Sequence, residues 1–150
     1  MKKIFPLFFS LALVAVSTTA TFAQLRKIPA EATNAFTAKY PAASNVEWKD
    51  KLSGFTADYT IEDIKYTASF NNKGDWENTE QEIVPADLPA VITDSYNKSK
   101  YADWTIGKVH KIDIHNDAVQ YRVEAVKNDI QKRNLYFNTK GRLLKDKITI

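Results

Sequence analysis

Few residue types in this chain could support chemistry, and its two histidines come first. His110 and His115 lie five positions apart, in or beside a predicted strand. Successive side chains of a strand point to opposite faces, so an odd spacing separates the two imidazoles. The chain has no cysteine, and neither histidine adjoins a tight carboxylate cluster. We therefore predict no metal site and interpret both as surface or hairpin residues.

An acidic run is the second candidate for chemistry. Asp75, Glu77, Glu80 and Glu82 follow one another in a predicted strand, where Glu80 and Glu82 share a face and Glu77 lies on the other. A divalent cation prefers several converging oxygen ligands. Because no glycine-bearing loop is present to wrap a cation, this run predicts a solvated strand face.

The remaining motifs that could do chemistry belong to turns. Asn71-Asn72 and Asn138-Thr139 lack the alternating acids and distal glutamate of a calcium loop. The four glycines form no phosphate-binding loop, nucleophile elbow or dinucleotide fingerprint. We predict no catalytic residue and no cofactor, hence no enzyme. An enzyme stays a third alternative, which would need a histidine, an acid and a hydroxyl in one pocket.

The elements that position these residues are indicated by a turn that occurs twice. Phe70-Asn71-Asn72-Lys73-Gly74 returns as Phe137-Asn138-Thr139-Lys140-Gly141. Each copy separates two runs of alternating apolar residues, which is typical of a β-hairpin, and glycine at the tip tolerates positive φ. A helix opening also repeats, as Ile28-Pro29-Ala30 and Leu88-Pro89-Ala90.

These repeats predict an α+β fold made by tandem duplication. Each copy is expected to be a helix plus a four-stranded antiparallel meander, with the helices packed on one face of the sheet. We place the copies at residues 24–86 and 87–150, together forming one structural unit.

Alternation within the first copy assigns the two faces of its sheet. The apolar residues that point one way are Phe55, Ala57, Tyr59, Ile61, Ile64, Tyr66, Ala68 and Phe70. Those that point the other way are Thr56, Asp58, Thr60, Lys65, Thr67 and Ser69. We expect the first face to be covered by a helix and the second to meet solvent.

The first 23 residues have the order of a secretory signal peptide. Lys2 and Lys3 precede an apolar run from Ile4 to Val16, and small residues follow as far as Ala23. The apolar run is too short for a comfortable membrane span. We predict a signal peptide at residues 1–23, a periplasmic or secreted protein, and no membrane contact after its removal.

The charge of the chain excludes one class of partner. The formal net charge is +3, and without Lys2 and Lys3 the 19 basic residues stand against 18 acidic ones. A balance near zero gives no global field to attract nucleic acid. The charge is nevertheless uneven, at −3 for residues 24–85 and +4 for residues 86–150. The two halves either complement each other or give the second half a basic patch for an acidic partner.

Five residues are our candidates for binding a partner. Aromatic side chains on an open sheet face dominate interface energetics, and Asp58 and Lys65 are predicted on the polar face. The candidate partner-binding residues are Trp48, Asp58, Lys65, Trp76 and Tyr136.

Several of these motifs together carry a family resemblance. Ile28-Pro29-Ala30 with Phe36, Tyr40-Pro41, Val46-Glu47-Trp48 and the stretch from Phe70 to Trp76 resembles the PepSY-like family of secreted bacterial proteins, also described as β-lactamase-inhibitor-like. The resemblance implies a fold similar to the β-lactamase inhibitory protein and a module that restrains another molecule. It carries over no inhibitory residue, and this chain lacks the disulfides of that inhibitor.

We therefore predict an exported, non-catalytic module that binds or restrains a protein or peptide partner in the cell envelope. The alternative is a small-ligand or peptide binder that uses a cleft between the repeats. The identity of the partner and the oligomeric state do not follow from the sequence.

Overall fold

The computed structural model describes residues 26–149, so the predicted signal peptide at residues 1–23 lies outside the described residues. Two helices, one 3-10 helix and eight strands follow one another along this part of the chain. They are α1 (Ala30–Lys39), β1 (Ser44–Lys51), β2 (Gly54–Ile61), β3 (Ile64–Asn71), β4 (Trp76–Ile83), η1 (Pro85–Asp87), α2 (Ala90–Asn97), β5 (Thr105–Ile114), β6 (Ala118–Val126), β7 (Lys132–Asn138) and β8 (Leu143–Ile148).

The predicted fold, a tandem duplication of a helix plus a four-stranded meander, is wrong. The strands form a single antiparallel sheet of eight strands in the order β1 to β8, accompanied by helices of only ten and eight residues. β4 pairs with β5 from Asn78–Ile114 to Ile83–Val109, so hydrogen bonding continues through the middle of the sheet. An isolated four-stranded unit would leave the backbone groups of β4 unpaired at an edge, and pairing with β5 satisfies them.

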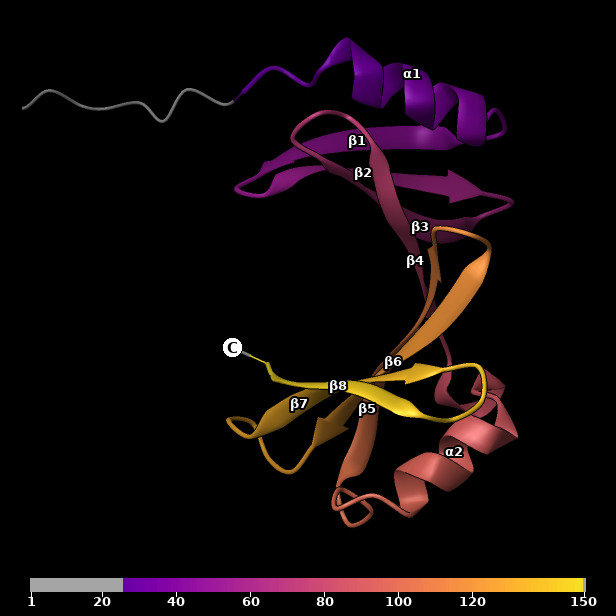
Figure 1. The fold of residues 1–150 in the computed structure, drawn as a ribbon, viewed down its shortest axis with the longest axis vertical. Coiled ribbons are helices and arrows are strands. Elements are labelled where there is room, and N and C mark those ends of the chain that lie inside the picture. Colours follow the sequence, from indigo (N-terminus) through magenta and orange to yellow (C-terminus); the bar gives the residue numbers. More distant parts are fainter. Residues whose placement is uncertain (1–25, 150) are drawn as a thin grey trace, which may run out of the picture.

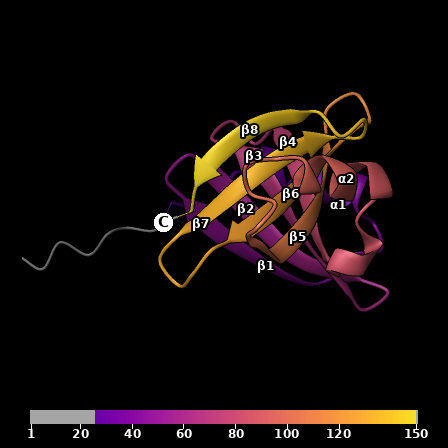
Figure 2. The ribbon, with the colours of Figure 1, turned by 90° about the horizontal axis from the view of Figure 1, so that it is seen from below.

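Both helices start at prolines and lie on the outer side of the curved sheet. Pro29 and Pro89 are the N-cap residues of α1 and α2, where a proline leaves no backbone donor unsatisfied. α1 lies over β1 and β2, and α2 lies beside β5 (Figure 1). Seen from below, the two helices are on the same side of the sheet (Figure 2).

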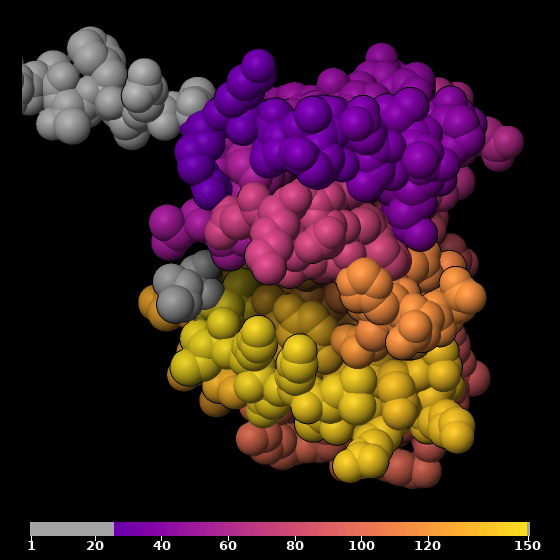
Figure 3. All heavy atoms as spheres, turned by 45° about the horizontal axis from the view of Figure 1, so that its top comes forward, coloured from indigo at the N-terminus to yellow at the C-terminus, as the bar shows by residue number. Residues whose placement is uncertain are grey.

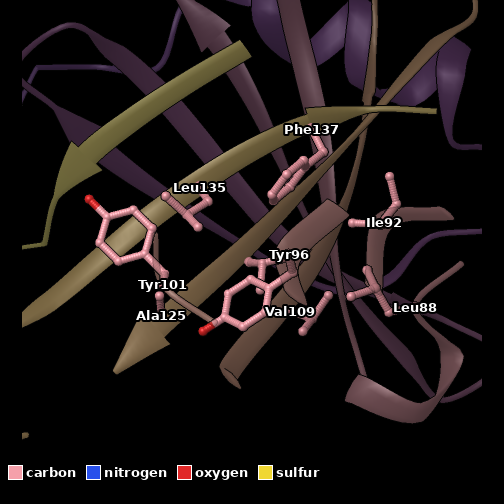
Figure 4. Packing of buried hydrophobic residues seen from close by; sticks show 9 residues of the cluster. Leu88, Ile92, Tyr96, Tyr101, Val109, Ala125, Leu135 and Phe137 are labelled. Carbon is pink, nitrogen blue, oxygen red and sulfur yellow. The ribbon is translucent and has the colours of Figure 1, made fainter. Parts of the chain in front are cut away.

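Under each helix lies an apolar cluster. Ala32 and Phe36 of α1 pack on the first half of the sheet, and Ile92 and Tyr96 of α2 pack on the second. The second cluster also includes Leu88, Tyr101, Val109, Val123, Ala125, Leu135 and Phe137 (Figure 4). Each large apolar side chain buried in this way contributes about 1.5–3 kcal/mol. The helices therefore cover the apolar face.

The faces predicted for the first half are confirmed by burial. The apolar set from Phe55 to Phe70 includes five side chains with at most 3% of their surface exposed, namely Phe55, Ala57, Tyr59, Ala68 and Phe70. Ile64 is 42% exposed because it begins β3 next to the turn. Alternation thus assigns the residues to the correct face, although residues at the ends of strands are more exposed than those in the middle.

The repeated turns are built alike and pack against the helices. Gly74 and Gly141 have φ of +91° and +79°. A Cβ on Gly74 would lie 2.7 Å from the backbone nitrogen of Ala32, and one on Gly141 would lie 2.5 Å from Ser95 Oγ. Glycine is needed at both tips for its backbone conformation and for its lack of a side chain.

The last strand is tied to the second cluster by a carboxylate. Asp146 accepts hydrogen bonds from the Tyr101 hydroxyl at 2.8 Å and from Arg133 Nε at 2.7 Å. Lys100 Nζ lies 3.3 Å away. Burial alone would raise the pKa of Asp146, but these three partners outweigh it and hold the pKa below its usual value.

Among the helices of residues 26–149, none combines the length and apolar character that a membrane span requires.

Candidate functional site

The sheet face opposite the helices, here called the open face, is the candidate site. No described helix covers it, and its side chains are those that alternate away from the buried clusters. Register pairs identify its members, for example Asp58 beside Thr67 and His110 between Glu82 and Arg122. Side chains from consecutive strands therefore lie next to one another across this face.

Over β1 to β5 the open face is hollowed into a pocket of about 620 Å³. The charged or titratable side chains around it are Glu47, Asp58, Lys65, Glu80, Glu82 and His110. Asn45, Tyr59, Thr60, Tyr66 and Thr67 complete the lining. Four carboxylates and one lysine line the pocket, and the carboxylates pair with cations outside the lining.

Asp58 is held in place from both neighbouring strands. Lys49 Nζ lies 2.6 Å from Asp58 Oδ2, and the Thr67 hydroxyl donates to Asp58 Oδ1 at 2.7 Å. Burial would raise the pKa of Asp58, but the contacts from Lys49 and Thr67 outweigh it and lower the pKa. Asp58 therefore carries a fixed negative charge at the edge of the pocket.

A bidentate ion pair spans the middle of the sheet. Arg122 of β6 donates from Nη1 to Glu80 Oε1 at 2.9 Å and from Nη2 to Glu80 Oε2 at 2.6 Å. The pair crosses β5 beside Ile112, an apolar residue on the open face whose surface is only 5% exposed. Paired, parallel hydrogen bonds of this kind fix geometry as well as charge.

His110 is the one histidine on the open face, next to this ion pair. Burial lowers its pKa, and the nearby Arg122 charge lowers it further, partly offset by Glu80 and Glu82. Its Nδ1 is shielded from solvent and has no hydrogen-bond partner among the described residues. A proton there would be buried without an acceptor, which is consistent with a neutral ring. His115, by contrast, packs edge-on to Trp76 with ring centroids 5.1 Å apart.

Charge is divided between the two ends of the open face. Over β1 to β4 the carboxylates outnumber the cations, with Glu47, Asp58, Glu80 and Glu82 against Lys49, Lys51 and Lys65. Over β5 to β8 the cations dominate, with Lys108, Arg122, Lys145 and Lys147 against Glu124. The uneven charge of the two halves of the sequence is thus expressed on one surface.

The structure brings three of the five predicted binding residues to the open face. Asp58 and Lys65 line the pocket, and Tyr136 lies on β7 between Arg122 and Lys145, with Lys147 Nζ 5.8 Å from its ring. A partner-binding role for these three residues remains a prediction.

The other two predicted residues lie on the helix side. Trp48 packs with its ring centroid 5.5 Å from that of Phe36, and Trp76 donates its indole N–H to Thr79 Oγ1 at 2.9 Å. Neither therefore lies where a partner on the open face would contact it.

Sequence reasoning missed the residues that complete the site. Alternation places Glu80 and Glu82 on one solvated face, but their partners Arg122 and His110 come from strands about 30 to 40 positions away. The only signal of this site in the sequence was that Glu80 and Glu82 share one face of a strand. It identifies a site only when the pairing of β4 with β5 is known.

The charged groups of the site are arranged mainly as ion pairs. Among residues 26–149 no group of three or more histidine, cysteine or acidic side chains is placed to hold a metal ion. Most of the carboxylates in the pocket are paired with cations, which suits contacts with a polar surface.

Solved structures from Bacteroides share this fold. A DUF2874 family protein from Bacteroides ovatus ATCC 8483 has a TM-score of 0.72 at 21% identity, covering 82% of this chain and 89% of that one. A structure from Bacteroides eggerthii DSM 20697, described as "putative periplasmic proteins", has a TM-score of 0.70 at 18% identity, covering 82% and 90%. A BLIP-like protein from Bacteroides fragilis NCTC 9343 has a TM-score of 0.70 at 23% identity, covering 83% and 88%.

Sequence comparison gives one further finding. The family model described as "Putative beta-lactamase-inhibitor-like, PepSY-like" matches residues 53–145. No curated protein matches the chain.

Proposed function

This chain belongs to the PepSY-like, β-lactamase-inhibitor-like family, as its turn and helix motifs predicted, and we propose that it is a non-catalytic module that binds a protein partner through its open face. The observation that supports this most is the hollowed, uncovered sheet face with its two oppositely charged ends. The partner is expected to be a protein of the cell envelope. The predicted signal sequence and a structural neighbour described as periplasmic support that location.

The charge division specifies the surface that would fit. A partner should present basic groups to the end formed by β1 to β4 and acidic groups to the end formed by β5 to β8. Complementary charge steers association and fixes one orientation. Tyr136, at the cationic end, supplies the aromatic anchor that interfaces favour.

The test uses the mature chain with matched variants. The protein is immobilised, partners are captured from an envelope extract of the organism that encodes it, and each is purified for affinity measurement. Lys65→Glu and Tyr136→Ala alter the open face, whereas Lys73→Glu makes the same charge change at an exposed turn. We expect Lys65→Glu, which makes the acidic end more negative, to tighten binding. Tyr136→Ala should weaken binding about tenfold, a typical interface-centre effect, and Lys73→Glu should leave it unchanged. Equal affinity of all variants, or no captured partner, would contradict the proposal.

A further inference from the structure

A second hollow lies on the opposite side of the sheet, beside the end of α1. It has a volume of about 400 Å³ and is bounded by the end of α1, the β2–β3 strands and the β5–β6 turn. The β5–β6 turn, orange in the space-filling view, lies next to the indigo and purple atoms of that helix end (Figure 3). Its size suits a small ligand.

Four aromatic rings form much of its wall. Tyr40 and Tyr59 have ring centroids 4.9 Å apart, and Tyr59 stacks on Tyr66 at 5.5 Å. The fourth ring, Trp76, binds Thr79 through its indole N–H, and the Tyr40 hydroxyl bonds the same Thr79 oxygen. Thr79 therefore occupies the polar tips of Tyr40 and Trp76, and a cation against this wall meets their rings.

A cation of the chain itself already sits on this wall. Lys39 Nζ lies 4.0 Å from the Trp76 ring centroid and 5.8 Å from that of Tyr40. Among residues 26–149 it has no ion-pair partner and donates no hydrogen bond. The described contacts of this ammonium group, on an exposed residue, are therefore with ring faces, as expected for a cation–π contact.

Two carboxylates complete the lining. Asp113 and Asp117 come from the end of β5 and the turn that follows it. Lys111 Nζ lies 3.5 Å from Asp113, so one of the two charges is partly compensated. Without Lys39, the charges of Asp113, Asp117 and Lys111 sum to −1. This negative charge favours a cationic occupant.

We propose that this hollow binds a small organic cation with a quaternary ammonium head, and that Lys39 is a tethered competitor for the same position. A head without N–H groups suits the site because the ammonium on Trp76 finds no acceptor among the described residues, whereas aromatic faces attract its diffuse charge. Tyr59 and Tyr66 border both hollows, but the other residues that line the two are different, so variants can test this site separately from the open face.

Choline is the probe, and its neutral isostere 3,3-dimethyl-1-butanol is the matched control ligand. Binding to the mature chain is followed by NMR through the indole N–H signals of the three tryptophans, at constant ionic strength. We expect a saturable shift of the Trp76 signal with choline and none with the isostere. Shifts from both ligands, or a choline shift confined to Trp48 or Trp104, would overturn the proposal.

Two variants make the test sharper without removing an aromatic ring. Lys39→Met should tighten choline binding about two- to fivefold, the ratio that corresponds to losing one exposed competing cation–π contact. Asp113→Asn should weaken it, and Lys73→Met, the same change at an exposed turn residue that does not line the hollow, should leave it unchanged. Absence of saturable binding to both the native chain and Lys39→Met would refute the site outright.

Discussion

Substituting Glu80 by glutamine tests whether the ion pair across the sheet contributes to the fold that presents the open face. The change keeps the shape of the side chain and removes its charge, so the bidentate contact with Arg122 loses its electrostatic part. The guanidinium then stays beside Ile112 and His110 without a carboxylate.

The free energy of unfolding that Glu80→Gln should remove follows from how far the ion pair is buried. The side chains of Glu80 and Arg122 are 25% and 20% exposed, so the pair is neither a surface ion pair nor a fully buried one. Hydrogen bonds to charged groups contribute about 1.5–3 kcal/mol, and we expect Glu80→Gln to destabilise the chain by about 2 kcal/mol. Since m-values in urea are about 1–3 kcal/mol per molar, the unfolding midpoint should fall by about 1 M.

The assay is equilibrium unfolding in urea of four proteins: native, Glu80→Gln, Arg122→Met and the double variant. A coupling energy of about 1–2 kcal/mol between the two sites would identify the pair as the cause. Glu77→Gln is the matched control, because Glu77 is exposed on the same strand and has no ion-pair partner among the described residues. If Glu80→Gln unfolds at the same midpoint as Glu77→Gln, the pair does not stabilise the sheet.

Three further predictions concern pH, the last strand and the turns. Because the folded pKa of His110 is lowered, its contribution to stability is present above the unfolded pKa of about 6.5 and is lost as pH falls through the folded value. Urea midpoints between pH 5 and 7.5 should therefore fall toward acid, and they should fall less in His110→Gln. Asp146→Asn should cost about 1.5–3 kcal/mol near neutral pH, measured by urea unfolding, because it removes the charge that binds β8 to the second cluster. Gly74→Ala should lower stability by at least about 1–2 kcal/mol. Gly107→Ala should destabilise the chain less, because Gly107 lacks positive φ and an added Cβ there would meet side-chain atoms. At Gly74 the added Cβ would meet backbone atoms. Equal thermal midpoints for the two variants would contradict this prediction.

How far the sequence predicted the fold depended on the range of the interactions involved. The assignment of residues 55–70 to two faces needed only alternation, and the turn tips at Gly74 and Gly141 needed only local backbone preferences. Both were correct because neighbouring residues decide them. The fold class was predicted as two copies of a helix plus a four-stranded meander, whereas β4 and β5, with a helix between them in the chain, pair to give one sheet of eight strands.

The candidate site shows the same limit. Trp48 pairs with Ala57 across β1 and β2, so it faces α1. The register shift of β1 lies before Glu47, and the face of Trp48 follows from its pairing across the β1–β2 hairpin, which alternation within β1 alone does not give. A one-residue change of register moves a side chain to the other face. Lys65, in a strand without such a shift relative to β2, was placed correctly on the open face.

The division between the two faces explains why the turns matter to a site that they do not line. In β6, Val123 is fully buried on the helix side, whereas its neighbour Arg122 reaches across the open face to Glu80. A slip of one residue would exchange the two, burying a guanidinium and exposing an apolar side chain. Asn138 Oδ1 accepts the backbone N–H groups of Lys140 and Arg142 at 3.0 and 2.9 Å, and this fixes the turn that sets the register of β7 and β8. Asn71 does the same for the turn between β3 and β4, with the N–H groups of residues 73 and 75 at 2.8 and 3.0 Å. The repeated turn therefore has no chemistry of its own, yet it sets the registers that place Glu80 and Glu82 of β4 and Lys145 and Lys147 of β8 on the open face.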